Sequence, residues 1–491
     1  MHLIKTLFFA CLLVSVSILP AQDTIPLSLT EVVELAQGEA PLSLIARTRL
    51  SNNYWQYQSF LADYKPRLAF EGTLPNLNRS LDVITLPNGQ DIFIQRSQMS
   101  SGVGINLRQN IPQTGGTVFA RSGLRRLDIF KSGNNPGTTS YLNTPFSIFF
   151  IQPIFGFNEL KWDRDLEKLR YKENQRGYSE DLEDVAVDAV ELFFNVLISQ
   201  LTLDASLKNR SNADTLLKIS QGRFGVGRIS ETELLQIELS AMNANAEVAA
   251  ATLQVQSFTE QLRNYLGVRR QVRFTLDAPE AIPTVDINVD TALIYATRNR
   301  SDAVNFERRL LDAESEVARA KRNRVDVNLS GTFGLSQTGA DISESYQDLL
   351  DQEQISLGVS FPIADWGKTK ADREIARSNQ QLVQMQVEQD RVSFQQEVLL
   401  NVQQYTLVRN QVQVALRAYE VAQKREDLSR QRYFIGTISI TDLTIAVREL
   451  NDARQGYYSS LRNFWRAYYE LRRLTLFDFI ENKSLVRSDT D

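Results

Sequence analysis

Residues 223–241 read RFGVGRISETELLQIELSA, and residues 432–450 read RYFIGTISITDLTIAVREL. The two stretches lie 209 positions apart and share an arginine, an aromatic residue, a glycine, an isoleucine, a serine, a threonine, an acidic residue and a leucine in the same order. The same offset pairs Pro153-Ile154 with Pro362-Ile363 without an insertion or deletion. Loops tolerate changes of length, whereas a long regular element does not. The sequence therefore predicts two internal repeats, each built on one long element.

The apolar residues before each quoted stretch follow a helical period. In the second copy their spacing is 4, 3, 7, 4 and 3, at Val398, Val402, Tyr405, Val412, Leu416 and Tyr419. This heptad-like spacing predicts helices that pack in coiled-coil fashion. Proline is absent from 154–278 and from 363 to the end. A continuous helix from Pro153 to Arg223 would be about 100 Å long.

A glycine-containing turn follows each long helix. The predicted helix stops are Gly225, Gly227 and Gly436. Ser230 and Glu233 are spaced as a capping box that opens a return helix, and Ser439 and Asp442 are a weaker variant. Apolar residues continue at spacings of 3 and 4 beyond both boxes. Each copy is thus predicted to be a long antiparallel hairpin, with its turn at 223–230 or 432–439.

Upstream of each long helix the apolar period changes to two, which predicts strands. Six runs have this pattern, four in the first copy and two in the second: 68–74, 103–111, 117–130, 145–152, 325–335 and 355–361. Apolar residues alternate with small polar ones, as in membrane β-barrel strands, although a half-buried strand of a soluble sheet has the same local pattern. Six strands cannot close a membrane barrel, and an open edge in lipid would leave backbone groups unpaired. If the strands are in a membrane, several chains must share one barrel.

Composition excludes several functional classes. The 491 residues carry a formal charge of −5, which argues against nucleic-acid binding, and the mean hydropathy of −0.27 argues against a polytopic helical membrane protein. Residues 1–21 have the charge and apolar pattern of a signal peptide cleaved after Ala21. The only histidine and cysteine, His2 and Cys11, lie within it. The exported chain therefore lacks the residues of Ser-His-Asp triads and of His/Cys metal sites, so we expect no enzyme activity and no cofactor.

The sequence resembles the TolC-like outer-membrane efflux proteins over nearly its whole exported length. Four features carry this resemblance: the two repeated turns, IPLSLTEVVELAQ at 25–37, VSFPIADWGKTKADREIARS at 359–378, and AESEVARAKRNRVDVNLSGTF at 313–333. The segment 152–174 is similar to that of members from the Bacteroidetes lineage. The resemblance implies an α+β membrane protein with long coiled-coil hairpins in a periplasmic α-barrel. It also implies that amphipathic strands form one outer-membrane β-barrel shared by a trimer.

Within this architecture we expect a signal peptide at 1–21, a first repeat at 22–278 and a second repeat at 279–491. Residues 266–290 and 475–491 are expected in an equatorial belt around the helices. The family commonly supplies four strands per protomer. The extra pair, roughly 115–130 and 141–152, either widens the barrel to eighteen strands or folds outside a twelve-stranded barrel; we favour the wider barrel.

The function implied by the resemblance is a passive exit duct of a tripartite efflux pump for small molecules. The implied partners are two further copies of the chain, a periplasmic membrane-fusion adaptor, an inner-membrane pump and outer-membrane lipid, but no nucleic acid. Two alternatives remain open at the level of sequence. One is the exit duct of type I protein secretion, and the other is a periplasmic coiled-coil scaffold without a channel.

The resemblance also implies a gate at the periplasmic turns. Its expected residues are Asp442, Tyr433, Thr441, Glu233 and Thr232. The family's usual arginine and second aspartate are replaced here by Ile438 and Ile445, so we expect closure to rely more on apolar packing. Asp442 is expected to form a carboxylate ring that favours cations, although helix capping alone also explains a carboxylate at this position.

The resemblance further places the adaptor contact at the two turns. The expected contact residues are Arg223, Gly227, Ser230, Arg432, Gly436 and Ser439. Their glycines and serines are expected to allow close approach of a partner. Arg223 and Arg432 also suit the C-terminal ends of the long helices, where a positive charge is favourable.

Overall fold

A computed structural model describes residues 24–131, 136–270, 272–279, 282–322 and 325–487. The predicted signal peptide lies outside these residues. The chain divides into two compact units. The first contains residues 24–45, Asp181–Asp286 and Asn401–Arg473, and the second contains Ala46–Glu180, Ile287–Leu400 and residues 474–487.

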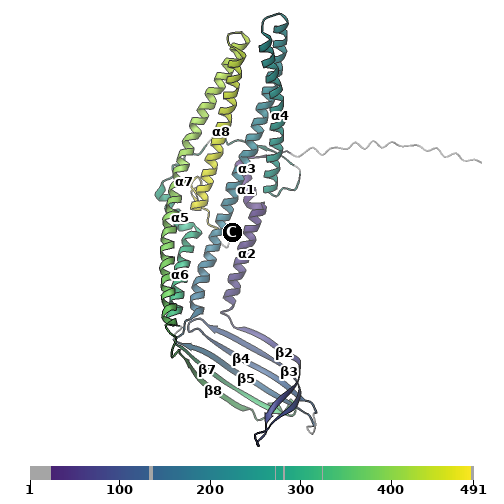
Figure 1. Cartoon of the computed structure of the whole chain (residues 1–491), viewed down its shortest axis with the longest axis vertical. Helices are drawn as coiled ribbons and strands as arrows, with labels where there is room; N and C mark the ends of the chain where they lie inside the picture. The colour runs from purple at the N-terminus through teal and green to yellow at the C-terminus, as the bar shows by residue number, and fades with distance from the viewer. Residues whose placement is uncertain (1–23, 132–135, 271, 280–281, 323–324, 488–491) are drawn as a thin grey trace, which may run out of the picture. The chain divides into compact units, whose positions relative to one another are not determined.

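The helices repeat in length as well as in order (Figure 1). The first set is α1 (Leu29–Glu39), α2 (Pro41–Ala62), α3 (Glu159–Gly225) and α4 (Glu231–Tyr265). The second set is α5 (Val289–Asn299), α6 (Ser301–Arg322), α7 (Lys368–Phe434) and α8 (Ile440–Thr475). Both α3 and α7 have 67 residues, which corresponds to about 100 Å. The two predicted hairpins are confirmed, with their turns where the sequence placed them.

The core of the first unit is aromatic where α7 meets α8. Phe464 and Tyr468 are at most 1% exposed, and both rings lie near that of Tyr405, at centroid distances of 5.5 and 6.3 Å. Tyr405 and Arg409 also donate hydrogen bonds of 3.0 and 2.9 Å to the Val285 carbonyl, which fixes the linker before α5 against α7. The aromatic residues of α8 therefore pack between helices, as their spacing predicted.

A short parallel pair in the same unit joins the two ends of the first repeat. Strand β1 (Thr24–Leu27) pairs with β6 (Arg273–Leu276). Gln200 of α3 holds β6 by donating to the Phe274 carbonyl at 2.6 Å and accepting from the Leu276 amide at 3.3 Å. In the second unit, β9 (Phe477–Asp478) pairs with β10 (Lys483–Ser484), and the Phe477 ring stacks on Tyr295 at 3.8 Å.

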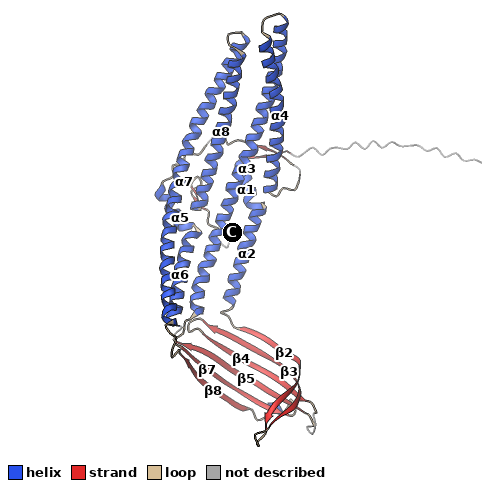
Figure 2. Cartoon of the chain, viewed as in Figure 1, coloured by secondary structure: helices blue, strands red, loops and turns tan. Residues whose placement is uncertain are grey.

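The second unit contains one antiparallel sheet of six strands (Figure 2). They are β2 (Arg67–Thr85), β3 (Asp91–Ile111), β4 (Gly116–Ile129), β5 (Thr138–Ile154), β7 (Asp326–Gly339) and β8 (Leu350–Ser360). The order is β2-β3-β4-β5-β7-β8. The additional pair, β4 and β5, is hydrogen-bonded to β3 and β7 on its two sides, so the interpretation that it folds outside the sheet is wrong.

One face of the sheet is apolar and exposed. Leu68 pairs with Leu107, and Phe70 with Ile105, on the same face. A bulge between Thr73 and Asn76 inserts one residue in β2, so the apolar positions change from even numbers to odd ones beyond it. The bulge therefore keeps Leu77, Leu81 and Val83 on the face of Leu68 and Phe70. These five side chains are 55–73% exposed within one chain.

The strands are longer than their alternation predicted. β2 and β3 have 19 and 21 residues, and a turn after Leu86 joins them. Gly89 of this turn has a φ of 82°, and its amide donates to the Leu86 carbonyl at 2.8 Å. Asn88-Gly89 is a typical hairpin signal that could have located this turn.

One described helix, α3, contains a window apolar and long enough to cross a membrane, with a mean hydropathy of 1.5. That window is 56% buried within the chain, as in the core helix of a folded domain. Its composition alone therefore does not identify a membrane-spanning helix.

Candidate gate and adaptor-contact site

Both hairpin turns end their long helix with the same pair of hydrogen bonds. In the first turn the Gly227 amide donates to the Phe224 carbonyl at 2.8 Å, and the Arg228 amide to the Arg223 carbonyl at 2.9 Å. In the second turn the equivalent bonds are 3.0 Å each, from Gly436 to Tyr433 and from Thr437 to Arg432. This is the Schellman arrangement, which needs a residue with positive φ after the helix.

Gly227 and Gly436 supply that conformation, with φ of 73° and 79°. A Cβ atom at either position would meet nothing within 4 Å. The backbone angle, rather than crowding, therefore explains the glycines. The local geometry thus gives a sufficient reason for both glycines, without the predicted close approach of a partner.

The return helices start with reciprocal capping boxes. The Ser230 hydroxyl accepts from the Glu233 amide at 3.3 Å, while the Ser230 amide donates to the Glu233 carboxylate at 3.1 Å. The Ser439 amide and hydroxyl donate to Asp442 Oδ2 at 3.1 and 2.7 Å, and the Asp442 amide donates back at 3.2 Å. These bonds from Ser439 lower the pKa of Asp442. The predicted helix-cap role of Asp442 is therefore present in the structure, and its carboxylate remains exposed.

The predicted gate residues differ in exposure. Tyr433 is only 8% exposed and belongs to an apolar cluster with Ile237, Ile440 and Leu443. Because Ile237 is on α4 and the others are on α7 and α8, this cluster packs the two hairpins together below their turns. Thr232 and Thr441 are exposed. Of the five gate candidates, Tyr433 alone is buried in this packing.

Two polar contacts also join the hairpins, and the sequence did not predict them. Arg223 donates to the Phe434 carbonyl at the end of α7, at 3.5 Å. Gln236 of α4 donates to the Thr441 hydroxyl at 3.3 Å. The structure thus brings the first turn's Arg223 to the second hairpin. Ser230, Arg432 and Ser439 are exposed at the turns, where a partner could reach them.

A groove of about 400 Å³ runs between the hairpins below the turns. Asn212 and Leu216 of α3, Leu239 of α4 and Phe434 at the end of α7 line it. On α7 it also contains Glu426, which is 3% exposed and accepts a hydrogen bond from Arg430 Nε at 3.0 Å. The i,i+4 spacing of this pair is visible in the sequence, but its burial depends on the other hairpin.

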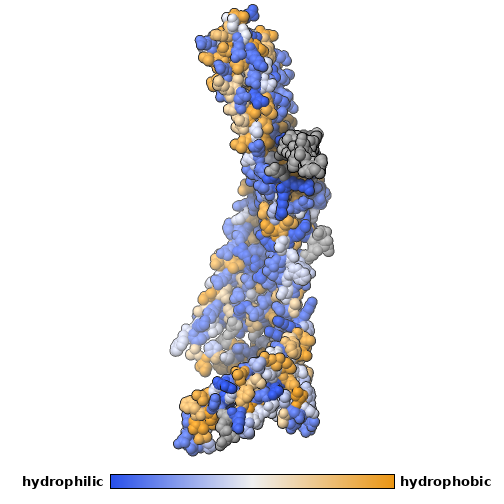
Figure 3. Space-filling view, turned by 90° about the vertical axis from the view of Figure 1, so that its right-hand side faces the viewer, coloured by the Kyte–Doolittle hydropathy of each residue, from blue (hydrophilic) through white to orange (hydrophobic). Residues whose placement is uncertain are grey.

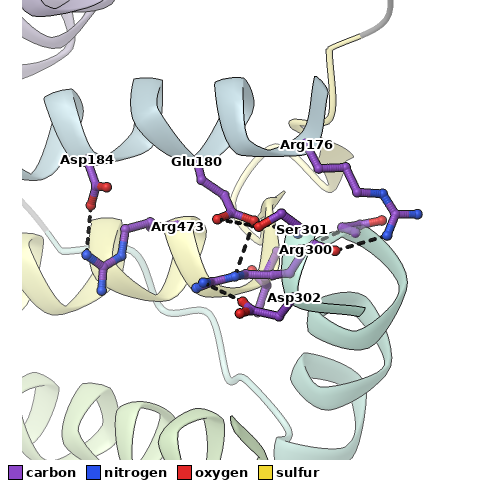
Figure 4. A network of polar contacts seen from close by, with 9 residues as sticks. Arg176, Glu180, Asp184, Arg300, Ser301, Asp302 and Arg473 are labelled. Atoms are coloured by element: carbon purple, nitrogen blue, oxygen red, sulfur yellow. Dashed lines mark hydrogen bonds and ion pairs between the residues drawn. The ribbon is translucent and has the colours of Figure 1, made fainter. Parts of the chain in front are cut away.

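Away from the turns, a buried carboxylate fixes the junction of α5 and α6 to α3 within the second unit (Figure 4). Glu180 accepts from the Ser301 amide at 2.6 Å and from its hydroxyl at 3.0 Å, and Arg300 lies 3.4 Å away. Arg176 donates to the Arg300 carbonyl at 2.9 Å. Burial raises the pKa of Glu180 despite these partners. Every group in this network has a structural partner, so we assign it to packing rather than to chemistry.

In the first unit a second set of ion pairs connects α3 to α8. Glu183 pairs with Arg472 at 3.1 Å, and both side chains are at most 12% exposed. Asp184 pairs with Arg473 at 2.7 Å. Gln37 of α1 donates to Glu183 at 3.0 Å, which adds the N-terminal helix to this contact. Among the described residues no group of three or more His, Cys, Asp or Glu side chains is placed to hold a metal ion.

Solved structures with similar folds include outer-membrane channels and a further membrane protein. A membrane protein from Pseudomonas aeruginosa has a TM-score of 0.65 at 15% identity, with 94% of this chain and 92% of that chain covered. The CusC channel has a TM-score of 0.64 at 14% identity, with 91% of each chain covered. The Campylobacter jejuni CmeC outer membrane channel has a TM-score of 0.63 at 15% identity, covering 91% and 85%. At these identities the likeness establishes the fold.

No curated protein matches the sequence. The sequence does match a family described as outer membrane efflux protein, in two segments, residues 93–268 and 296–475. Each segment contains one of the long hairpins, and together they make up more than half of the chain. This family consists of efflux channels of the outer membrane, and it is not an enzyme family. The chain belongs to the outer membrane efflux protein family.

Proposed function

We propose that this chain forms the exit duct of a tripartite pump and passively conducts small molecules across the outer membrane. The observation that supports this most directly is the family match in both repeats, each containing a 67-residue helix. The energy for export would come from an inner-membrane pump. A periplasmic adaptor would connect that pump to the hairpin turns.

The functional unit in this proposal is a trimer that shares one barrel. Strands β2 and β8 are the edges of the sheet, each with one neighbour. The chain enters the sheet along β2 and leaves it along β8, and an even number of antiparallel strands makes these edges run in opposite directions. β8 of one copy can therefore pair antiparallel with β2 of the next. Three copies would close a barrel of eighteen strands, which leaves no edge in lipid.

The proposed gate lies at the turns and uses Asp442 and Thr441 of the second repeat and Thr232 and Glu233 of the first. Tyr433 would support it from below through its apolar cluster. Three copies of Asp442 would form a ring that favours cations. Replacing Asp442 with alanine should lower the cation preference measured in single-channel recordings. An unchanged ion preference would leave Asp442 with its capping role alone.

The proposed adaptor contact includes Arg223, Gly227 and Ser230 in the first turn, and Arg432, Gly436 and Ser439 in the second. These positions combine exposed polar groups with rigid, capped turns, so a partner would meet a surface that needs little ordering. Gly227 and Gly436 would act by holding the turn conformation.

An export assay tests the proposal. Cells that lack this chain should accumulate a fluorescent efflux substrate, and the native chain should restore export. The variant Arg432→Glu with Ser439→Arg should fold and trimerise but fail to restore export, while Arg417→Glu, an exposed change elsewhere on α7, should restore it. Full export by the turn variant would contradict the adaptor contact. Absence of any export defect in cells lacking the chain would contradict the efflux function.

A further inference from the structure

The polar face of the sheet carries an excess of positive charge over β2, β3 and β4. The register places its residues opposite the apolar face, at alternate positions along 67–73, 102–108 and 117–125. Of these described positions, the charged ones are Arg67, Glu71, Arg108, Arg121 and Arg125. Four arginines thus share this face with one carboxylate, although the whole chain is acidic.

Arg121 and Arg125 have no acidic residue opposite them on the neighbouring strands. Arg121 lies between Asn106 and Ser147, and Arg125 lies between Gly102 and Leu142. Within the described part of the chain, neither guanidinium group has an ion-pair or hydrogen-bond partner, and both side chains are exposed.

The charges next to Arg125 on the other face are arranged differently. Arg126 and Asp128, which point to the apolar face, form an ion pair of 2.8 Å. Arg67 and Arg108 on the polar face are direct cross-strand partners of like charge, an unfavourable arrangement for a sheet. On the apolar face, Arg126 and Asp128 neutralise each other. The polar face has no such pairing at Arg121 and Arg125 and therefore keeps a positive field.

A hollow lies over these residues. Its volume is about 520 Å³, and its lining includes Glu71, Arg121 and Arg125. Gly104 and Gly123 are cross-strand partners in its floor. A Cβ atom at Gly104 would lie 2.9 Å from the Ser122 carbonyl oxygen, so the backbone leaves no room for a side chain there. The glycines thus keep open the space between the two arginines.

We propose that this face is an anion-attracting segment of the conduction path, which takes solutes with carboxylate or phosphate groups. The inference rests on the proposed duct, in which the polar face lines the lumen. Three copies would surround the lumen with twelve arginines and three Glu71 carboxylates. Rings of charged side chains select ions by sign, and guanidinium groups bind carboxylate and phosphate with paired hydrogen bonds. Arg121 and Arg125 belong to β4, so the additional hairpin of this sheet supplies the charge.

The test uses the purified full chain in planar lipid bilayers with a potassium chloride gradient. In Arg121→Gln/Arg125→Gln, we expect the ratio of cation to anion permeability to rise severalfold relative to the native channel. Arg121→Lys/Arg125→Lys should keep the native ratio. Arg126→Gln/Asp128→Asn removes an ion pair from the opposite face without changing the net charge, and it should also keep the native ratio.

Inorganic pyrophosphate provides a second readout. It should block the native channel at lower concentration than it blocks the glutamine variant. Unchanged selectivity and unchanged block in a conducting glutamine variant would overturn the inference and leave the duct intact. A native chain that forms no channel would instead overturn the proposed duct itself. In Asp442→Ala the ratio of cation to anion permeability is expected to fall, whereas in the glutamine variant it is expected to rise. The two charged regions can therefore be told apart.

Discussion

The return helices α4 and α8 begin with matching capping boxes but bury different side chains. On α8, large side chains are fully buried, among them Leu461, Phe464, Tyr468, Leu471 and Leu474. On α4, the large residues Leu235, Leu239, Met242 and Leu253 are 57–67% exposed, and small residues such as Ala241, Ala244 and Ala251 face the chain's own core. Hydrophobic side chains are visible at the surface of the hairpin ends (Figure 3).

This difference shows that one apolar period can serve two purposes. The period of α8 builds the core of its own hairpin. The row Leu235, Leu239, Met242 and Leu253 of α4 is not buried within the chain, and in the proposed trimer a neighbouring copy would cover it. Substitutions on the two helices should therefore affect different properties.

The largest effect is expected for the exposed row of α4. Leu235→Ser/Leu239→Ser/Met242→Ser should dissociate the trimer, because each of these side chains contributes about 1.5–3 kcal/mol when fully buried. Light scattering in mild detergent would measure the mass of the assembly. Glu238→Ser/Asn243→Ser, two exposed polar changes on the same helix, is the control. A stable trimer in the triple variant would show that α4 is not an interface.

Phe464→Ala should destabilise the fold of the single chain. The ring is completely buried beside Tyr405, and removal of a buried phenylalanine costs about 3–5 kcal/mol. Denaturant unfolding of the detergent-solubilised protein would measure this loss. Leu253→Ala on α4, where the side chain is 67% exposed, should cost much less. Equal losses in both variants would remove the contrast between the helices.

Gly436→Val should cost about 1–2 kcal/mol, because a side chain is strained at positive φ. Asparagine tolerates this backbone region better, so Gly436→Asn should recover most of the loss. The melting temperatures of the two variants would be compared, and Gly227→Val and Gly227→Asn should behave in the same way. If valine and asparagine were equally tolerated, the strained-turn explanation would be incorrect.

The smallest effect concerns the acidic cap of α8. Its hydrogen bonds with Ser439 lower the pKa of Asp442 in the folded chain. A carboxyl with a lowered folded-state pKa stabilises the fold above its unfolded pKa, and this contribution is lost as pH falls through the folded pKa. The stability difference between the native chain and Asp442→Ala should thus be full at neutral pH and shrink below about pH 3.9, the usual aspartate pKa. Thermal unfolding at several pH values would measure it; a difference independent of pH would contradict this account.

The sequence was sufficient to predict the hairpins because their signals are local. Helical period, glycine stops and capping boxes each involve residues a few positions apart, and the resulting helices end where predicted. The helical period of apolar residues does not indicate which other helix covers them, so the exposure of Leu239 could not be predicted. Contacts such as Gln236 with Thr441 join residues 205 positions apart, and no local pattern marks them.

The sheet was predicted in strand number but not in length. The alternation in β2 breaks at the bulge between Thr73 and Asn76, where the apolar positions change parity. A pattern search with a strict period of two therefore stops at Leu74. Only the register shows that Arg121 and Arg125 share a face with Arg108. For the gate, the sequence indicated the capping of Asp442, but the burial of Tyr433 requires the other hairpin.

Helices α3 and α7 have the same length, and this equality keeps the two hairpin turns at the same level. A deletion of seven residues from α3 alone would preserve its heptad register but draw its turn back by about 10 Å. Gln236 would then no longer reach Thr441, and Ile237 would leave the cluster around Tyr433. The same deletion in both helices would keep the turns level and shorten both hairpins. Changes of length in one repeat are therefore tolerable only when the other repeat changes by the same amount.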